Sequence, residues 1–381
     1  MGGKVKSVVE KGDKGDKPSA RFGHTATLVG DKVIVFGGCL GDMKEYTITG
    51  DGYTLDLSNK QWSKLQADNG SAAPCARAAH AAACVEGSQL VIYGGATGGG
   101  ALVPDELHVL DFKGGGNSAW MPVPVTGGTP GKRYGHTMVF NKPLLIVCGG
   151  SVSNKIECDI WILDVEHSPF QWTEINVSGK NQPLPRVYHT AEVCREGPAS
   201  GMMILFGGRT KDNRSLKDVW GLRQHRDRRW DWVEAPTKKG NAPEARFQHI
   251  GLCFKRFLLI IGGRGSDVNK TLPTCIYDTE SCEWKSLGAS SDRFRTAAWI
   301  MEKYMQSFGG FEHDNPNLPT NAVMSLDLEA AFSEAGLKFP GPQKMHKIGS
   351  VTEEPDSDTE TTKGKKAKKG SEKDDKAKVQ L

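Results

Sequence analysis

Val33-Ile34-Val35-Phe36-Gly37-Gly38 is the stretch that decides the fold, because an apolar run ending in a diglycine pair returns six times along the chain. Successive pairs lie 57, 55, 58, 55 and 47 residues apart. A period near 50 residues is typical of one blade of a β-propeller and is longer than the common helical repeats. The repeat therefore predicts an all-β, six-bladed propeller. The pairs are Gly37-Gly38, Gly94-Gly95, Gly149-Gly150, Gly207-Gly208, Gly262-Gly263 and Gly309-Gly310.

Each unit carries the same four sequence elements in the same order, which predicts four antiparallel strands per blade. The first element is the motif R-x-x-H with small or β-branched residues after it, and the second is the apolar run into the diglycine. The third is an alternating strand that ends in Leu-Asp or its like, and the fourth carries a tryptophan. The R-x-x-H motifs begin at Arg21, Arg77, Arg133, Arg186 and Arg246. The tryptophans are Trp62, Trp120, Trp172, Trp232 and Trp284.

The blade geometry assigns a structural role to each repeated residue. Glycines allow neighbouring backbones to approach closely near a crowded central channel. A tryptophan supplies a large apolar body that packs between adjacent blades. We expect the arginine and histidine of R-x-x-H to hydrogen-bond loops and neighbouring blades. Five histidines at one repeat position therefore do not predict a metal site. They are His24, His80, His136, His189 and His249.

The pattern resembles the kelch repeat over roughly residues 20 to 330. Several stretches are similar, more particularly, to the kelch half of the kelch-containing serine/threonine phosphatases of plants and protists. These stretches are Arg77-Ala78-Ala79-His80-Ala81-Ala82-Ala83, Arg133-Tyr134-Gly135-His136, Asp159-Ile160-Trp161-Ile162-Leu163-Asp164 with Phe170-Gln171-Trp172, and Trp230-Asp231-Trp232 followed by Ala245-Arg246-Phe247-Gln248-His249. The resemblance implies a kelch propeller that serves for recognition.

The sixth unit departs from this pattern at both ends. It has Arg293-Phe294-Arg295-Thr296 without the histidine, and no tryptophan strand follows Leu326-Asp327. The N-terminus offers the missing strand, because Ser7-Val8-Val9-Glu10 precedes Arg21 as Trp232-Val233-Glu234 precedes Arg246. We therefore predict that residues 5–10 complete the last blade. Such closure removes sheet edges that invite pairing with other chains.

The repeat divides the chain into three parts. We expect an N-terminal segment at 1–20 with the closing strand, a six-bladed propeller at 21–336 and a disordered charged tail at 337–381. Six units use about 300 of the 381 residues as one closed body. A hydrophobic content of 38% with 46 glycines and 9 tryptophans suits many short strands and tight turns.

The composition favours a protein of a reducing compartment outside the membrane. No run of 18 apolar residues could span a bilayer, and Met1–Lys6 does not resemble a secretory signal. None of the nine cysteines forms a C-x-x-C pair, and most lie in apolar strand-like runs. We interpret them as small buried thiols rather than disulfide or zinc partners. The expected location is the cytoplasm or the nucleus.

The sequence gives no support for catalysis. The phosphatase motifs G-D-x-H-G, G-D-x-V-D-R-G and G-N-H-E do not occur, so the chain has the recognition half of that resemblance without the catalytic half. No nucleophile, base and orienting group can be assembled into a triad. A copper radical oxidase built on a kelch propeller would need a cysteine cross-linked to tyrosine, and loop ligands of that kind leave little trace in one sequence. We expect no enzyme, no cofactor and no bound metal.

Strand direction predicts where a partner would bind. In a four-stranded antiparallel blade, the loop before the first strand and the loop after the second emerge on one face, which we call the rim. The basic rim residues are Arg209, Lys211, Arg214, Arg264, Arg293 and Arg295. Together they could form a crescent on adjacent blades that takes an acidic or phosphorylated segment.

Two other interpretations of the rim stay open at this point. The arginines could pair with Asp212, Asp218, Asp267 or Asp292 and only hold the loops. Phe311, beside His313, could be exposed at the pore mouth and anchor a partner better than any charge.

The C-terminal tail separates its charges by sign, although the net charge of the whole chain is only +4. An acidic stretch, Glu353–Glu360, contains Ser357 and Thr359 as candidate sites for an acidophilic kinase. The tail buries almost nothing and is expected to be disordered. Its basic run could be a nuclear address, an RNA contact or only a solubilising segment. That run contains Lys363, Lys365, Lys366, Lys368 and Lys369.

These observations favour a non-catalytic adaptor or scaffold that binds protein through the rim, with the lysine-rich tail tuning localisation or affinity. The alternative is a ribosome- or RNA-associated factor whose basic tail contacts RNA. A third hypothesis, a propeller enzyme, would need a metal or small molecule that the sequence does not reveal. We expect a monomeric propeller with one or more protein partners and no membrane contact.

Overall fold

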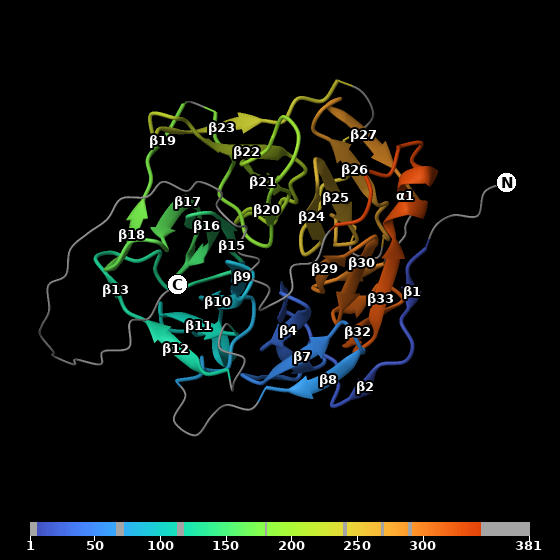
Figure 1. Cartoon of the computed structure of the whole chain (residues 1–381), viewed down its shortest axis with the longest axis horizontal. Coiled ribbons are helices and arrows are strands. Elements are labelled where there is room, and N and C mark those ends of the chain that lie inside the picture. Colours follow the sequence, from blue (N-terminus) through green and yellow to red (C-terminus); the bar gives the residue numbers. More distant parts are fainter. Residues whose placement is uncertain are drawn as a thin grey trace, which may run out of the picture.

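The computed structural model describes residues 6–65, 72–112, 118–179, 181–238, 242–267, 270–288 and 292–343. Six sheets stand around a central axis, one for each repeat unit (Figure 1). The first strand of each sheet lies nearest the axis and contacts the first strands of both neighbouring sheets. The predicted six-bladed propeller is confirmed.

Blades 1 to 3 each contain four antiparallel strands that run outward from the axis in chain order. Blade 1 has β3 (Thr25–Val29), β4 (Lys32–Phe36), β7 (Gly52–Asp56) and β8 (Gln61–Lys64). Blade 2 has β9 (Ala81–Val85), β10 (Gln89–Tyr93), β11 (Leu107–Asp111) and β12 (Trp120–Val123). Blade 3 has β15 (Thr137–Asn141), β16 (Leu144–Val152), β17 (Lys155–Asp164) and β18 (Phe170–Glu174).

Blades 4 to 6 repeat this arrangement, and the last one borrows a strand. Blade 4 has β20 (Thr190–Val193), β21 (Met203–Phe206), β22 (Val219–Gln224) and β23 (Trp230–Glu234). Blade 5 has β24 (Ile250–Phe254), β25 (Phe257–Ile261), β26 (Cys275–Asp278) and β27 (Glu283–Ser286). Blade 6 has β29 (Ala297–Met301), β30 (Tyr304–Phe308), β33 (Val323–Asp327) and, from the N-terminus, β1 (Val8–Val9).

The N-terminal strand closes the ring as the sequence predicts. Val8 pairs with Ser325 and Val9 with Met324 in antiparallel register. The Glu10 N–H donates to the carbonyl of Val323 at 2.8 Å. The first and last parts of the propeller are therefore joined by backbone hydrogen bonds.

Short parallel strands, which the sequence did not reveal, extend three of the blades. After leaving one blade, the chain pairs briefly with the outer strand of the next. In this way β2 (Lys14–Gly15) joins β8, β13 (Val125–Thr126) joins β18, and β19 (Val177–Ser178) joins β23. The N-terminal segment consequently contributes β1 to blade 6 and β2 to blade 1.

The diglycines stand where neighbouring backbones approach most closely. Gly262 and Gly263 have φ values of 62° and 88°, which L side chains rarely adopt. A Cβ on Gly262 would lie 2.2 Å from the carbonyl oxygen of Arg293, and one on Gly263 would lie 2.5 Å from the Cβ of His249. The close approach predicted from the repeat is confirmed.

The tryptophans fill the spaces between blades, as predicted. Each of four packs on the aromatic residue before the diglycine of the preceding blade, with ring centroids 5.1–6.2 Å apart. At the junction between the first and last blades, Trp62 of blade 1 contacts Phe308 of blade 6. The other three pairs are Trp120 with Phe36, Trp172 with Tyr93, and Trp284 with Phe206.

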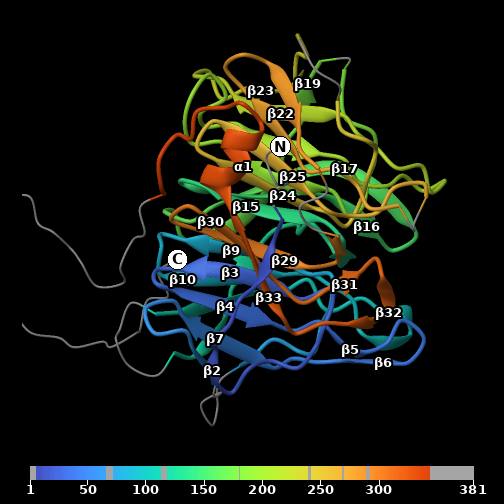
Figure 2. The same cartoon turned by 90° about the vertical axis from the view of Figure 1, so that its right-hand side faces the viewer.

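The remaining short elements stand at the rim. A hairpin of β5 (Cys39–Gly41) and β6 (Tyr46–Ile48) projects from blade 1, and β31 (Phe311–Glu312) with β32 (Asn315–Pro319) projects from blade 6 (Figure 2). The strands β14 (Arg133–Tyr134) and β28 (Arg293–Phe294) and the 3-10 turn η1 (Gly98–Gly100) also lie there.

The chain ends its described part on the face opposite the rim. Helix α1 (Leu328–Glu334) is capped by Asp327, whose carboxylate accepts from the N–H of Ala330 at 3.1 Å. Phe339 stacks on Phe254, and Gln343 pairs with Glu302. Packing therefore continues beyond the boundary at residue 336 that we expected from the sequence. No helix in the described part of the chain combines the length and apolar character needed to cross a lipid bilayer.

Candidate functional site

The arginines of R-x-x-H are structural. In five blades the guanidinium is buried, and its Nη1 donates to the carbonyl of the first glycine of the diglycine pair at 2.8–3.1 Å. Arg186 also forms a bidentate pair with Asp218, at 2.9 and 2.7 Å. These bonds fix the start of each first strand to its own blade. The role predicted for these arginines is confirmed.

The histidines of the motif join neighbouring blades. His80, His189 and His249 are buried, and the Nε2 of each is hydrogen-bonded at 2.8–3.0 Å to the hydroxyl of a threonine in the preceding blade. Burial lowers the pKa of His24 and His189 to about 3 and lowers the pKa of the other three well below the usual value. All five are therefore neutral at pH 7. The hydrogen-bond partners of four of them are protein groups of the blade interfaces: those of His24, His80, His189 and His249.

The third residue of each R-x-x-H position forms a closed ring of backbone hydrogen bonds around the axis. All six residues have φ between 53° and 65°. The N–H of each donates to the carbonyl of its counterpart in the preceding blade, over 2.8–3.4 Å. This ring holds the six blades together at the rim. Its members are Gly23, Ala79, Gly135, Tyr188, Gln248 and Arg295.

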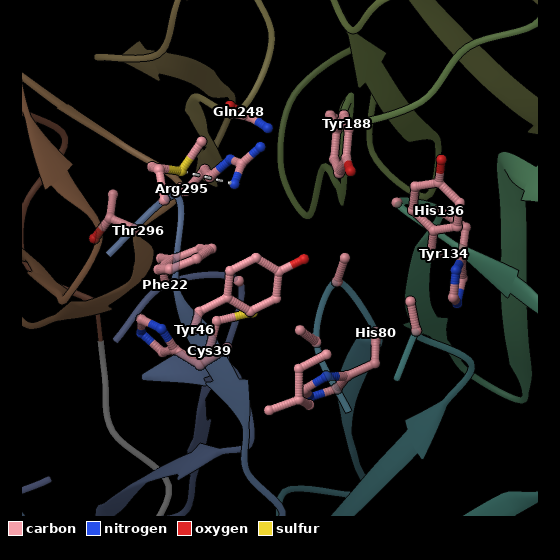
Figure 3. Close-up of a pocket in the computed structure, with 18 of the residues that line it drawn as sticks. Phe22, Cys39, Tyr46, His80, Tyr134, His136, Tyr188, Gln248, Arg295 and Thr296 are labelled. Atoms are coloured by element: carbon pink, nitrogen blue, oxygen red, sulfur yellow. Dashed lines mark hydrogen bonds between the residues drawn. The ribbon is translucent and has the colours of Figure 1, made fainter. Parts of the chain in front are cut away.

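A cavity of about 480 Å³ opens at this ring and is lined by residues of all six blades. Blades 1 to 3 contribute Gly23, Ala79 and Gly135 from the ring, which leave the cavity wide on that side. Blades 4 to 6 contribute the larger side chains of Tyr188, Gln248 and Arg295 (Figure 3). The rim cavity is therefore open on one half and polar on the other.

Three arginines lie on the polar half of the rim and rest on aromatic rings. The guanidinium carbon of Arg209 is 5.2 Å from the ring centroid of Phe247, and that of Arg264 is 4.8 Å from Phe294. Arg295 lies 5.5 Å from the ring of Phe22. We call these three residues the arginine cluster. At such distances a cation is attracted to the face of the aromatic ring.

The arginine cluster has no acidic partner among the residues that the structure describes, because no ion pair there involves any of the three. The Nε atoms of all three are buried without a hydrogen-bond partner. Burial lowers the pKa of Arg264, and the positive charges of Arg295 and Arg209 lower it further. These cations therefore repel one another at a surface that is partly buried from solvent. In the described part of the chain, these arginines therefore do not pair with the neighbouring aspartates.

Three of the four aspartates named in that interpretation have other partners or surroundings. Asp218 is bound by Arg186, and Asp212 accepts from the hydroxyl of Thr210. Asp292 is half-buried, which raises the pKa of its carboxyl, with the negative charges of Glu312 and Asp314 adding to the effect. The backbone carbonyl of Asp292 is hydrogen-bonded to His313.

Three residues predicted for the rim are packed inside it. Phe311, which we expected to be exposed, is 0% exposed because it lies between Phe294 and Phe22, with centroids 5.4 and 4.7 Å away. Arg293 is also 0% exposed and forms an ion pair with Glu312 at 2.9 Å. His313 packs its ring edge-on against Phe294. The prediction of an exposed Phe311 anchor is therefore wrong.

Lys211 and Arg214 lie beside the arginine cluster but belong to a different environment. They are exposed on the turn that follows Arg209. Thr210 holds this turn, since its N–H donates to the carbonyl of Arg214 at 3.0 Å. These two cations are solvated, whereas those of the arginine cluster are stacked and half-buried.

Sequence reasoning did not single out several residues of the rim cavity. Tyr188 and Gln248 are the third residues of their R-x-x-H motifs, so alignment of that position would have found them. Tyr46 comes from the β5–β6 hairpin, lies in the cavity wall and is 47% exposed. Nothing in the repeat marks it, because the hairpin lengths differ between blades.

The opposite end of the channel is lined by a different set of residues. Its mouth is lined by apolar ends of the first strands, with Glu192, Arg195 and Gln343 among them. Burial raises the pKa of Glu192 to about 7. This mouth thus holds one acidic and one basic side chain, whereas Arg295 is the ionised side chain among the described residues that line the rim cavity.

The residues predicted to act in the tail lie outside the described residues. They are Ser357, Thr359, Lys363, Lys365, Lys366, Lys368 and Lys369.

Comparison with known proteins relates this geometry to a family. The family model of the KLHDC2/KLHL20/DRC7 kelch-repeats domain matches residues 23–222 and 169–347. Serine/threonine-protein phosphatase BSL2 of Arabidopsis thaliana is 33% identical over 281 residues, which cover 72% of this chain and 25% of the phosphatase. The matched part of the phosphatase is its kelch region. The predicted resemblance to kelch-containing phosphatases is confirmed.

Two further relatives extend the comparison. Kelch domain-containing protein 10 of Homo sapiens is 30% identical over 217 residues, which cover 54% of this chain and 45% of the relative. The solved structure of YjhT shares the fold with a TM-score of 0.60 at 15% identity, over 81% of this chain and 95% of that one. The chain spans less than half the length of these two curated relatives. With its family model matching well over half of the sequence, this protein belongs to the kelch-repeat family.

Proposed function

We propose that this propeller is a non-catalytic adaptor or scaffold that binds an acidic or phosphorylated segment of a partner protein in the rim cavity. Kelch propellers typically bind proteins. The observation that carries the proposal is the arginine cluster. Its three half-buried cations pair with no carboxylate of the described residues, and one of them, Arg295, lines a cavity built by all six blades.

Electrostatics favours an anionic ligand for this cavity. Mutual repulsion of the three guanidinium groups is a cost of the unbound state, and an anion would relieve it. Charge-assisted hydrogen bonds to guanidinium groups are shorter and stronger than neutral ones, and more so away from water. The open half of the cavity, at Gly23, Ala79 and Gly135, leaves room for the backbone of an extended segment.

The tail and the location of the protein complete the proposal. The last described residue, Gln343, lies at the opposite mouth of the channel. We propose that the tail tunes localisation or affinity and that the protein acts in the cytoplasm or nucleus. The alternative proposal is that the tail contacts RNA and the propeller only accompanies it.

Proximity labelling in native cells tests the proposal with three forms of the protein. They are the full chain, a chain ending at Gln343, and the triple variant Arg209→Met, Arg264→Met, Arg295→Met. Methionine keeps an apolar contact with the aromatic rings and removes the charge. We expect one set of labelled proteins to disappear with the triple variant and to persist when the tail is removed.

The control is the double variant Lys211→Ala, Arg214→Ala, which removes two exposed charges from the same loop. It should leave the labelled set unchanged. If partners vanish only with the tail, and are ribosomes or RNA-binding proteins whose capture falls steeply with salt, the RNA alternative replaces the proposal.

A further inference from the structure

The rim cavity carries positive charge without compensation. Among the described residues that line it, Arg295 is the one with a full charge at pH 7, since the lining histidines are neutral. Arg209 adds to this charge from behind Tyr188, whose ring it faces at 5.9 Å. Arg264 completes the cluster. Three cations in one place exceed the charge of a single carboxylate.

The donors of the cluster are little used within the part of the chain that the structure describes. There, the Nε–H groups of the three arginines are buried without acceptors. The one hydrogen bond that a described partner accepts from the side chain of Arg295 is weak, because Nη1 donates to the thioether of Met43 at 3.4 Å. Aromatic rings lie 4.8–5.5 Å from the guanidinium carbons, and no carboxylate of the described residues pairs with these cations.

Neutral donors surround the same space. Tyr188, Tyr134 and Tyr46 carry hydroxyl groups into the cavity wall, and Gln248 lies beside Arg295 (Figure 3). Burial raises the pKa of Tyr188, which therefore keeps its proton as a hydrogen-bond donor at pH 7. The cavity thus offers neutral hydrogen-bonding groups beside its cations.

A phosphate monoester matches this set of groups better than a carboxylate does. It carries roughly −1.5 to −2 charges at pH 7 and three terminal oxygens, against one charge and two oxygens. Resting on the function proposed above, we propose that the arginine cluster receives the phosphate of a phosphorylated serine, threonine or tyrosine in the partner segment, and that a residue beside the phosphate is apolar.

The preference for an apolar residue beside the phosphate follows from the side chains on the half of the rim next to Arg295. Phe22 and Met43 line the cavity there, and Tyr46 is 47% exposed above them. Leu318, on β32 of the neighbouring hairpin, is 57% exposed. The two hairpins contact each other through β5 and β32. Together they form an apolar wall beside the cations.

Oriented peptide pools test both parts of the inference. The probes are 11-residue peptides, acetylated and amidated so that they have no terminal charge, with random flanks around a fixed centre. The centre is phosphoserine, phosphothreonine or phosphotyrosine in three pools, glutamate in a fourth and serine in a fifth. Each pool is passed over the immobilised full chain, and the retained peptides are quantified and sequenced by mass spectrometry.

We expect at least one phosphorylated pool to be retained about tenfold more than the glutamate pool, with apolar residues enriched beside the phosphate. The triple variant Arg209→Met, Arg264→Met, Arg295→Met should lose this retention, and Lys211→Ala, Arg214→Ala should keep it. Tyr46→Ala should weaken the apolar enrichment and not the phosphate preference. Thermal unfolding checks that each variant folds, and the single change Arg264→Met replaces the triple variant if that one does not fold.

Other outcomes would separate this inference from the proposed function. Equal retention of the glutamate and phosphorylated pools would overturn the phosphate preference and leave an acidic-segment binder. Retention of no pool above the serine pool would also overturn it, while the labelling experiment still decides whether the rim binds a partner. If inorganic phosphate competes as well as the retained peptides at equal concentration, the site binds a free anion and the segment is not recognised.

Discussion

At the scale of single residues, one position explains most of the rim. The residue after each diglycine pairs with the second residue of R-x-x-H in its own blade, and its side chain reaches the next blade. In this way Arg209 meets Phe247, Arg264 meets Phe294, and Phe311 meets Phe22. The same position therefore supplies a half-buried arginine in two blades and a buried phenylalanine in the third.

The buried pair of Arg186 and Asp218 should contribute strongly to stability. Burial alone would raise the pKa of Asp218, but the hydrogen bonds from Arg186 hold it below the usual value. We expect Arg186→Met to lower the free energy of unfolding by about 3 kcal/mol or more, because it leaves a partly buried carboxylate unpaired. Chemical denaturation measures this change.

A matched control uses the exposed pair of Arg229 and Asp227, whose N–O distance is also 2.7 Å. Arg229→Met should leave the free energy of unfolding nearly unchanged, because exposed pairs are screened by water and salt. Similar losses for the two variants would contradict the structural role assigned to the R-x-x-H arginines.

At the scale of elements, the N-terminal segment is the part whose sequence and structure agree most closely. The match between Ser7–Glu10 and the outer strand of blade 4 predicted that this segment completes blade 6, and β1 pairs with β33 as expected. The strand β2 could not be predicted in the same way. Lys14-Gly15 has no apolar pattern, and a two-residue parallel pairing depends only on where the neighbouring blade stands.

Closure by β1 should depend on its backbone. Glu10→Pro removes the N–H that donates to Val323, whereas Glu10→Ala removes only the side chain that pairs with Lys60 at 3.0 Å. We expect the proline variant to be less stable than the alanine variant by about 1–3 kcal/mol. Amide hydrogen exchange should also rise in β33 of the proline variant. Equal stability and equal exchange in the two variants would show that β1 does not hold the ring.

The candidate site could be predicted in part from the sequence. Arg209 and Arg264 followed from strand direction, which places the residue after each diglycine at the rim. The burial of Phe311 did not follow, because its neighbour Phe22 lies almost 300 positions away and meets it only when the ring closes. Exposure at a blade interface depends on the facing blade, and one unit contains no information about that contact.

At the scale of the whole molecule, the five R-x-x-H histidines should make stability depend on pH. Burial lowers their pKa in the folded state, to about 3 for His24 and His189, whereas an unfolded histidine titrates near 6.5. Below pH 6.5 the unfolded chain therefore binds protons that the folded chain does not. The stabilisation is complete above pH 6.5 and is lost as the pH falls.

Urea unfolding at pH 7.5, 6.5, 5.8 and 5.0 measures this dependence. Each histidine can contribute up to about 1.4 kcal/mol per pH unit to the slope of the free energy of unfolding against pH. Glu192, whose pKa is raised to about 7, takes up one proton in the folded state and therefore reduces this slope. His136→Gln should reduce the slope of the free energy of unfolding against pH by the equivalent of about one bound proton. A flat profile from pH 7.5 to 5.0 would contradict the assignment of neutral buried histidines.

The borrowed strand of blade 6 has a consequence for the order in which the protein is made. Residues of β1 leave the ribosome before the six blades do, but their partner strand β33 is among the last of the propeller to be synthesised. At the usual rate of roughly 5–20 residues per second, tens of seconds pass between the two. During that time five blades can form while the N-terminal segment waits and one sheet edge stays open. A nascent chain of this kind is most exposed to wrong pairing just before it is finished, when a chaperone would protect it best.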